Sequence, residues 1–596
     1  MNTASTGQPA EPAQTSGFSL IIDSASDQVV CGLARGEGLL ADLHIDAARS
    51  ANQRLIPTIE QLLRQNQVDK TDLKRIICGI GPGSFTGIRI ALACARALSS
   101  ALGLPLYGVS SLDAIAEQLR PEHPDCPDFA VFIDALRGES SVASYHQDGT
   151  TLHVTAPAQT LPPEQLPDLP LLTGQAQARG YWQAYQDGLW QDPQAIYTRP
   201  SFAEEQEAVP APPDAPQAVE DFAGGSHPTA ALNTPAKQPT RAGAEAPQAT
   251  KAILAIESSC DETAAAVITL DGELLSNVIS SQVAAHARFN GVVPEIASRK
   301  HIEYIQPVVE MALEDARVAY SGRPSQVNLA AVAVTYAPGL IGGLVIGVSF
   351  AKALAWALDL PLIMVNHLEG HIYANLLEHP KLEPPFVAAL ISGGNTMLVE
   401  ASNWGHYRVL GQTIDDAAGE CFDKVSKALG LGYPGGPAIS KMAQGGNPKA
   451  VRFPRAMIGR HDLMFSFSGL KTAVLEYLHA QEATGHPVGP AELPDVCASF
   501  EAAVIDVQVR KALKAVEQTG VKTFCAGGGV AANQELRQAY QEAFAKREVA
   551  VYLPGKIACT DNAAMIARAA LDRYQAGRFS DLSADAEARA DLERPY

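Results

Sequence analysis

Two histidines four residues apart, His367 and His371, follow a short apolar run that is typical of a buried strand. On a helix, residues i and i+4 lie on one face, so both imidazole rings can point at one ion. An isolated pair with this spacing is most often two surface histidines. Its place after a strand favours a metal site, because ligands collect at strand ends in open α/β sheets. Asp561, which opens a predicted helix, can supply a third, carboxylate ligand.

A zinc protease is the obvious alternative for such a pair. That motif needs Glu immediately after the first His, where it activates a water molecule. Here position 368 is Leu, and Glu369 lies about 200° around the helix from His367. The sequence therefore argues against a protease.

Three glycine-rich turns follow apolar runs in the same part of the chain, at residues 392–396, 431–437 and 527–533. Small residues let a nucleotide approach the backbone, and hydroxyls and amides supply hydrogen bonds. About half of such turns only solve a packing problem between helix and sheet. Three of them beside a metal pair favour a nucleotide cleft.

An acidic segment, residues 415–424, lies between the first two of these turns. A cluster of carboxylates is usually a solvated helix face. Asp423, however, adjoins the apolar residues Phe422 and Val425, and an acid in this setting can accept hydrogen bonds from a ribose.

The elements that position these residues occur twice in the chain. Residues 82–105 align without a gap with the segment beginning at Pro338, at a constant offset of 256, and share residues such as Pro82, Gly83 and Gly87. Each copy predicts a strand, a Gly-rich turn, an Ala-rich helix and a second strand, which indicates α/β layers. Where the second copy has His367 and His371, the first has Ser111 and Ile115.

Length and composition set the frame for these motifs. A chain of 596 residues with 46% hydrophobic and 18% charged residues predicts two or three globular domains. Residues 204–250 are rich in Pro, Ala and acids and poor in large apolar residues, which predicts a tether. We expect a disordered N-terminus at 1–17, a first domain at 18–202, a linker at 203–250 and a second domain at 251–596.

Charge and cysteine usage exclude several classes. The net charge of -20 leaves no global basic field, so RNA contact must depend on a local patch of basic residues. The candidates are Arg452, Arg455, Arg460 and Lys471, and the alternative is that these residues are part of an ordinary surface of mixed charge. The nine cysteines contain no CxxC pair, which predicts neither a zinc ribbon nor a disulfide framework. With no signal peptide or membrane span predicted, we expect a cytoplasmic protein without membrane contact.

Seven motifs of the second half, in order, resemble the TsaD family over residues 253 to about 577. They are Glu257-Ser-Ser-Cys-Asp-Glu-Thr263, His367-x3-His371, Ser392-Gly-Gly394, Asp415-Asp-Ala-Ala-Gly-Glu420, Tyr433-Pro-Gly-Gly-Pro437, Phe465-Ser-Phe-Ser-Gly-Leu-Lys471 and Cys559-Thr-Asp-Asn562. The first half, residues 18–202, resembles the non-catalytic relative TsaB through Gly81-Pro-Gly-Ser-Phe-Thr-Gly-Ile-Arg89, Ile133-Asp-Ala135 and Tyr197-Thr-Arg-Pro200.

The resemblance implies two modules of the ASKHA fold (actin, sugar kinase, Hsp70), each internally duplicated. It implies transfer of threonylcarbamoyl from threonylcarbamoyl-AMP to N6 of the tRNA adenosine next to the anticodon, at position 37. It implies one divalent ion, iron or zinc, held by His367, His371 and Asp561. It further implies adenylate binding by Leu390, Ile391, Ser392, Gly393, Gly394, Asp423, Gly436 and Asn533.

The implied partners are tRNA, a TsaE-like ATPase and a TsaC-like enzyme that supplies the adenylate. The TsaB-like half is expected to pair with the TsaD-like half, within one chain or between chains. Asn395 stands where many bacterial members have His, so any role of that His is lost or passes to an amide. Asp261 is our candidate general base, from its place at the predicted cleft mouth.

Two further classes compete with a transferase. A sugar kinase or chaperone-like ATPase would use the same fold without a His pair, so His367 and His371 count against it. A regulatory scaffold fits the first half, whereas the set His367, His371 and Asp561 argues against it for the second.

Overall fold

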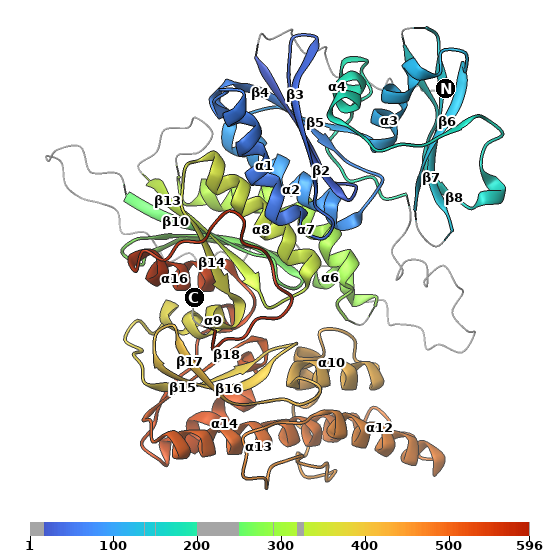
Figure 1. The fold of residues 1–596 in the computed structure, drawn as a ribbon. Helices are drawn as coiled ribbons and strands as arrows, with labels where there is room; N and C mark the ends of the chain where they lie inside the picture. Colours follow the sequence, from blue (N-terminus) through green and yellow to red (C-terminus); the bar gives the residue numbers. More distant parts are fainter. Residues whose placement is uncertain are drawn as a thin grey trace, which may run out of the picture. The chain divides into compact units, whose positions relative to one another are not determined.

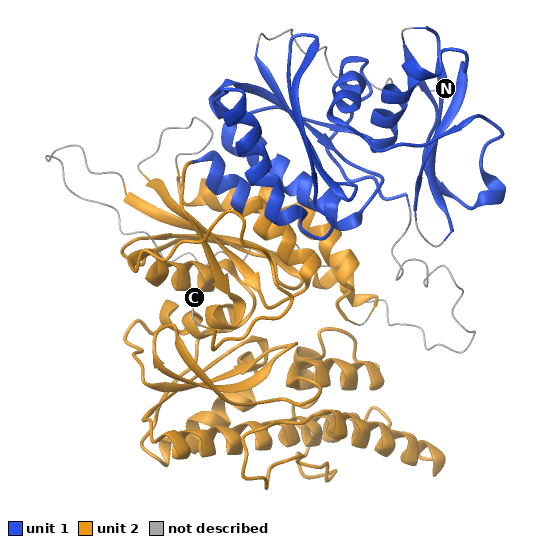
Figure 2. Ribbon diagram, viewed as in Figure 1, with its two compact units in different colours: residues 1–200, 352–358 blue, residues 201–351, 359–596 orange. Residues whose placement is uncertain are grey.

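The computed structural model describes residues 17–135, 138–149, 151–198, 250–289, 291–318 and 327–594. The expected disordered N-terminus and the expected linker fall almost entirely outside these residues. Two compact units make up the chain, residues 1–200 with 352–358, and residues 201–351 with 359–596 (Figure 2). Each unit contains two β-sheets flanked by helices (Figure 1).

The first sheet of the first unit has the strand order β3-β2-β1-β4-β5. The central strand β1 pairs antiparallel with β2 and parallel with β4. The strands are β1 (Phe18–Asp23), β2 (Gln28–Arg35), β3 (Gly38–Asp46), β4 (Leu73–Gly79) and β5 (Leu106–Val109). Two helices accompany them, α1 (Ala51–Gln65) and α2 (Phe85–Leu102).

Helix α2 is the one helix among the described residues with the length and apolarity of a membrane span. Most of its residues are buried, and it packs against β1, β4 and β5 in the core of the unit. Ser84 caps its N-terminus by accepting a hydrogen bond from Gly87 N at 3.2 Å. A Cβ at Gly87 would lie 1.7 Å from the carbonyl oxygen of Ser24, so the close approach of helix and strand end requires glycine.

The second sheet of the first unit has the order β8-β7-β6-β9. Its strands are β6 (Asp128–Asp134), β7 (Ser140–Gln147), β8 (Leu152–Leu161) and β9 (Leu171–Leu172). Helices α3 (Ser111–Leu119) and α4 (Ala178–Gln186) pack against each other, and their apolar residues share one core cluster with Ile21, Ile77, Phe129 and Val131.

The second unit begins with a sheet of the order β12-β11-β10-β13-β14. Its strands are β10 (Thr250–Glu257), β11 (Glu262–Thr269), β12 (Leu274–Ser281), β13 (Val327–Ala337) and β14 (Leu362–Asn366). The accompanying helices are α6 (Val283–Ala287), α7 (Pro294–Asp315), α8 (Ile341–Ala357), α9 (His367–Tyr373) and α16 (Ala563–Gln575). Residues 352–357 of α8 are assigned to the first unit. Gly343 repeats the close approach of Gly87, because a Cβ there would lie 2.4 Å from the carbonyl oxygen of Ser258.

The second sheet of this unit has the order β17-β16-β15-β18-β19. Its strands are β15 (Phe386–Ile391), β16 (Thr396–Asn403), β17 (His406–Gln412), β18 (Thr523–Gly527) and β19 (Ala550–Tyr552). The helices are α10 (Ala418–Ala428), α11 (Gly435–Met442), α12 (Ser468–Ala483), α13 (Leu493–Thr519), α14 (Gln534–Ala545) and α15 (Lys556–Cys559).

One strand order thus recurs in all four sheets, in three of them with five strands and in the fourth with the last strand missing. Each repeat is a three-stranded antiparallel meander followed by parallel strands reached through helical crossovers. The prediction of an α/β chain with two internally duplicated modules is therefore confirmed. In the second unit the ends of β10, β13 and β14 lie together, since Thr335 and His367 both hydrogen-bond to Glu257.

Candidate metal and nucleotide site

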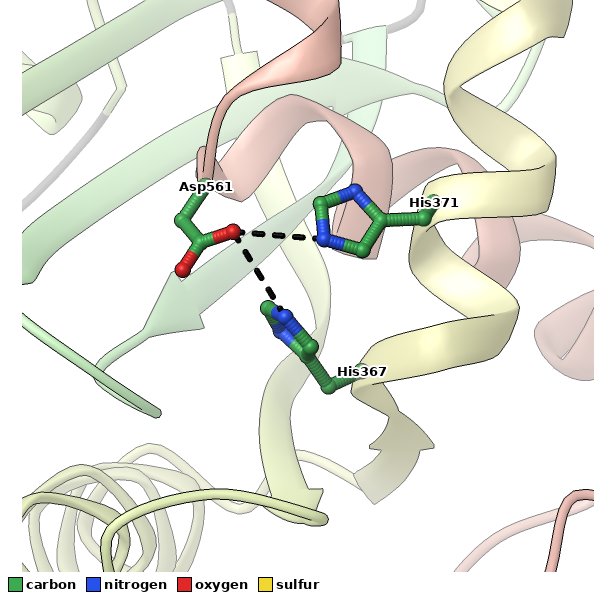
Figure 3. A group of neighbouring side chains, drawn as sticks. All are labelled: His367, His371 and Asp561. Atoms are coloured by element: carbon green, nitrogen blue, oxygen red, sulfur yellow. Dashed lines mark ion pairs between the residues drawn. The ribbon is translucent and has the colours of Figure 1, made fainter. Parts of the chain in front are cut away.

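The two histidines are positioned by the junction between β14 and α9. Asn366 ends the strand and caps the helix, since its Oδ1 accepts a hydrogen bond from Leu368 N at 2.9 Å. The helix therefore starts at His367, and His371 lies one turn later on the same face. Asp561 precedes α16, whose N-terminus is capped by Asn562 accepting from Met565 N at 3.0 Å. The structure brings these three residues together (Figure 3).

Their geometry is that of a metal-ligand set. Asp561 Oδ1 lies 3.2 Å from His371 Nε2 and 3.5 Å from His367 Nε2, and the three ligand atoms lie within 4.8 Å of one another (Figure 3). Both histidines are buried. His371 Nδ1 is inaccessible to solvent and has no hydrogen-bond partner among the described residues, and Nε2 has only the Asp561 carboxylate beside it. Two imidazole nitrogens and a carboxylate are a donor set that suits zinc or iron.

Burial and the charges of neighbouring groups shift the pKa values of all three side chains. Burial lowers the pKa of His367, but the carboxylates of Asp561 and Glu257 outweigh burial and raise it to about 9. Burial raises the pKa of Asp561, whereas the two histidines lower it, with a net fall to about 2. Burial lowers the pKa of His371. A divalent cation held by these residues would have to displace one proton from His367, whereas the Asp561 carboxylate would already be ionised.

Glu257, at the end of β10, holds His367 from the side opposite to Asp561. Its fully buried carboxylate accepts hydrogen bonds from three groups. Ser259 N donates to Oε1 at 2.6 Å, while Thr335 Oγ1 at 2.6 Å and His367 Nδ1 at 3.0 Å donate to Oε2. His367 Nδ1 also lies 3.0 Å from Ser259 Oγ. Sequence reasoning recorded Glu257 only as part of a motif and missed Thr335, because their meeting depends on the parallel register of β10 and β13.

Asp261 lies in the turn between β10 and β11 and is buried, with 7% of its surface exposed. Its Oδ2 accepts a hydrogen bond from Tyr433 Oη at 3.4 Å, so it faces the turn before α11. Burial, followed by the charges of Asp261 and Asp561, raises the pKa of its neighbour Glu262 well above the usual range. The Asp261 carboxylate is thus in contact with the turn that contains Tyr433, and its role as a base stays a prediction.

Glu369, the acid that a protease would need as its base, is buried on another face of α9. It forms an ion pair with Arg573 of α16 and accepts a hydrogen bond from Tyr407 Oη at 3.2 Å. Arg573 also donates to the carbonyl oxygen of Met364 at 2.7 Å. Glu369 therefore fastens the helix that carries the histidines and is not available to activate water.

The first predicted nucleotide loop follows β15. Leu390 and Ile391 are fully buried with their side chains in the apolar cores, so only their backbone can meet a ligand. Ser392 closes the turn by accepting from Asn395 N at 3.1 Å. Gly393 and Gly394 are open, since a Cβ at either would meet nothing within 4 Å.

The next loop brings Asp423 and Gly436 close to one another. Asp423 Oδ1 accepts a hydrogen bond from Gly435 N at 2.7 Å, which ties α10 to the start of α11. Burial, partly offset by this hydrogen bond, raises the pKa of Asp423 to about 6, and the charge of Asp261 contributes to the rise. A Cβ at Gly436 would meet nothing within 4 Å, so the backbone there is open to a ligand.

Both polar atoms of the Asn533 side chain form hydrogen bonds within the protein. Its Oδ1 caps α14 by accepting from Leu536 N at 2.9 Å. Its Nδ2 donates to Ser440 Oγ at 2.9 Å and to Glu501 Oε1 at 2.6 Å. Sequence reasoning did not identify Ser440 and Glu501, because they lie on helices far from Asn533 in the chain. The predicted contact with an adenylate stays a prediction.

The candidate RNA patch is largely neutralised by acids. Arg455 pairs with Asp506 at 2.9 Å, Arg460 pairs with Asp462 at 2.9 Å, and Lys471 lies 3.5 Å from Asp416. Arg452 is exposed and has no ion pair among the described residues. These pairs weaken the patch as a source of positive charge.

The first unit contains a counterpart of the Glu257 network without metal ligands. Asp23 ends β1 as Glu257 ends β10, and it accepts from Ala25 N at 3.1 Å as Glu257 accepts from Ser259 N. The hydroxyl of Tyr181, from α4, hydrogen-bonds to Asp23 and lies 3.1 Å from Ser111 Oγ. A Cβ at Gly79 would lie 2.7 Å from this hydroxyl.

At the constant offset of 256, Ser111 corresponds to His367 and Gly79 to Thr335. The phenol of Tyr181 thus makes the contacts that Thr335 and His367 make in the second unit.

The fold and the site together define a class, that of duplicated α/β proteins in which one of two units carries a His-His-Asp cluster beside glycine-rich turns. Within this class, the family model described as TsaD, tRNA N6-adenosine threonylcarbamoyltransferase, matches residues 45–203 and 273–568. The chain belongs to this family.

Curated relatives agree with the family match. The tRNA N6-adenosine threonylcarbamoyltransferase of Clostridium perfringens (strain SM101) is 50% identical over 337 residues, which cover 56% of this chain and 97% of that protein. The protein of the same name from Desulfitobacterium hafniense (strain Y51) is 53% identical over 322 residues, 54% of this chain and 92% of that protein.

Two solved structures are more distantly similar. A Pseudomonas aeruginosa protein described as similar to peptidase YEAZ is 22% identical and covers 31% of this chain and all of its own, with a TM-score of 0.28. Full-length HypF is 13% identical and covers 56% of this chain and 48% of its own, with a TM-score of 0.38.

Proposed function

We propose that the second unit transfers threonylcarbamoyl from threonylcarbamoyl-AMP to N6 of the tRNA adenosine next to the anticodon, at position 37. The observation that carries this proposal is the convergence of His367, His371 and Asp561 beside the open loops at Gly393 and Gly436, in a chain of the TsaD family. A protease would lack its general base, because Glu369 is held by Arg573, and a sugar kinase would leave the His pair without a role.

The three ligands would hold one divalent ion, iron or zinc, per chain. When bound, the ion supplies Lewis-acid polarisation of a phosphate or carbamoyl oxygen of the substrate. Asp423 would accept a hydrogen bond from the ribose, and the backbone at Leu390 to Gly394 and at Gly436 would lie against the adenylate. Asn533 supports this surface by capping α14.

In the transfer, N6 of the adenine attacks the carbamoyl carbon and a new N–C bond forms. The bond between that carbon and the phosphate oxygen breaks, and AMP leaves with the electron pair. Asp261 would accept the proton that N6 loses. Because the anhydride is already a good electrophile, the residues of the site act mainly by aligning the two substrates.

The first unit would serve as a TsaB-like partner with no catalytic role. Its network of Asp23, Tyr181 and Ser111 contains none of the three metal ligands, which supports this assignment. We further propose that residues 18–202 and 251–596 are the two functional domains, that they pair within or between chains, and that the protein acts in the cytoplasm. A TsaC-like enzyme would supply the adenylate and a TsaE-like ATPase would support turnover.

Mass spectrometry of tRNA nucleosides tests the proposal. Full-length protein is incubated with tRNA, threonine, bicarbonate, ATP and an adenylate-forming enzyme, and threonylcarbamoyladenosine is quantified. His367→Ala should lower the initial rate at least about 100-fold, because losing a ligand exceeds the loss of an outer-sphere partner. His479→Ala, at an exposed position of α12, is the matched control and should behave as wild type. Equal product from His367→Ala and wild type would refute the metal site.

A further inference from the structure

We infer that Glu257 is a positioning residue that fixes the ring protonation of His367, so that Nε2 is free to bind the metal ion. This inference rests on the proposed metal site and adds to it a residue that is not itself a ligand.

A histidine ring binds a metal through a nitrogen that carries no proton. His367 Nε2 faces Asp561 at 3.5 Å, and Nδ1 lies 3.0 Å from Glu257 Oε2. A carboxylate can only accept, so Nδ1 must carry the proton and donate it. In the neutral ring the other nitrogen, Nε2, then presents its lone pair on the side of Asp561 and His371.

The carboxylate is locked in the orientation that this requires. Ser259 N, a backbone group that can only donate, lies 2.6 Å from Oε1. Thr335 Oγ1 lies 2.6 Å from Oε2, the same oxygen that accepts from His367. With no part of its surface exposed, Glu257 has no water to exchange for these partners.

The isosteric change Glu257→Gln would replace one acceptor oxygen of this network by an NH2 donor. Since Ser259 N can only donate, the amide oxygen of Gln must take the place of Oε1. The amide NH2 then takes the place of Oε2 and faces Thr335 Oγ1 and His367 Nδ1. The threonine hydroxyl can turn to accept, but Nδ1 then faces an NH2 donor and keeps only Ser259 Oγ, at 3.0 Å, as a possible acceptor. The substitution therefore favours the ring with its proton on Nε2, where the proton blocks the metal-binding position.

The first unit supplies the matched comparison. Asp23 ends the corresponding strand and makes the corresponding contact to the backbone two residues on, but its side-chain partner is the phenol of Tyr181. Asp23→Asn changes the same chemistry at a place with no histidine ligand. It should leave metal binding unchanged.

The test measures Zn²⁺ and Co²⁺ affinity of the full-length chain by competition with a chromophoric chelator. Glu257→Gln should weaken binding by about 10–100-fold or more, with a reduced visible absorption of the bound Co²⁺, while Asp23→Asn equals wild type. Unfolding in the presence of chelator is measured for all three proteins, so that metal affinities are compared only under conditions in which each protein is folded.

A second measurement needs no variant in Glu257 and therefore does not depend on its folding. In Zn²⁺-loaded wild type with ¹⁵N-labelled histidine rings, Nδ1 of His367 should be protonated and Nε2 bound to the ion, with the signal assigned by its loss in His367→Ala. A proton on Nε2, or wild-type affinity in Glu257→Gln, would overturn the inference. Equal affinity of wild type and His367→Ala would instead refute the proposed metal site.

Discussion

The buried ion pair between Glu369 and Arg573 yields the sharpest stability prediction, because it fastens α9 to α16 directly behind the histidines. Glu369 is 2% exposed and Arg573 9%, and Glu369 also accepts from Tyr407 while Arg573 donates to Met364 O. We consider Glu369→Leu, Arg573→Met and the double variant, which replaces the pair by apolar side chains.

Each single substitution leaves one charge buried without its ionic partner. Such losses cost about 3–5 kcal/mol, and the lower end applies to Glu369→Leu because Arg573 keeps the carbonyl of Met364. A domain is stable by only about 5–15 kcal/mol, so either single variant takes away a large part of the stability of the second unit. The double variant should be more stable than either single one, since no charge is then left buried.

Urea unfolding in chelator gives the free energy of unfolding, and hydrogen exchange of peptides from α9 and α16 localises the change. Glu587→Gln is the control, because its ion pair with Arg594 is largely exposed and should contribute less than about 1 kcal/mol. If the double variant loses the sum of the two single losses, the pair is not coupled and the reasoning is wrong.

Two further predictions concern the nucleotide side of the site. The pKa of Asp423 in the folded protein is raised to about 6, so the native state binds the proton more tightly than the unfolded chain, and stability falls as pH rises through this range. Asp423→Asn should therefore raise the free energy of unfolding at pH 8 by about 1–2 kcal/mol. We also expect wild type to lose AMP affinity below pH 6, where Asp423 becomes protonated, and the variant should not show this loss. A pH profile in calorimetry that is the same for both proteins would contradict the prediction. Asn533→Asp keeps a good helix cap but places a second carboxylate next to Glu501, whose Oε1 lies 2.6 Å from Nδ2 of Asn533. It should therefore destabilise the protein more than Asn533→Ala, in which the lost cap costs about 1 kcal/mol. Thermal unfolding of the two variants in the opposite order would contradict the second prediction.

The sequence was sufficient for the repeated architecture and for the three candidate ligands. The offset between residues 82–105 and the segment from Pro338 predicted two related modules, and the recurring strand order confirms the duplicated fold. The histidine spacing placed both rings on one helix face, because helical periodicity is a local property. The structure adds the distances that bring Asp561 to them.

Contacts that depend on tertiary packing could not be read from the sequence. Glu257 meets Thr335 because Ile256 pairs with Val334 in parallel register. Glu369 meets Arg573 although the two residues are 204 positions apart in the sequence. Local patterns gave no reason to expect that the Asn533 amide would be held by Ser440 and Glu501. The expected linker, apart from Thr250 at the start of β10, lies in residues that the structure does not describe.

The phenol of Tyr181 has a consequence for how the two units depend on their surroundings. In the first unit, the group that satisfies the acid at the strand end belongs to the chain and is present as soon as the unit folds. In the second, the corresponding place is held by a ring whose outer nitrogen would be completed by a diffusible ion. The metal content of the growth medium would then change the stability of the second unit and not that of the first. The first unit of each molecule can therefore serve as the reference against which the stability of the second is compared.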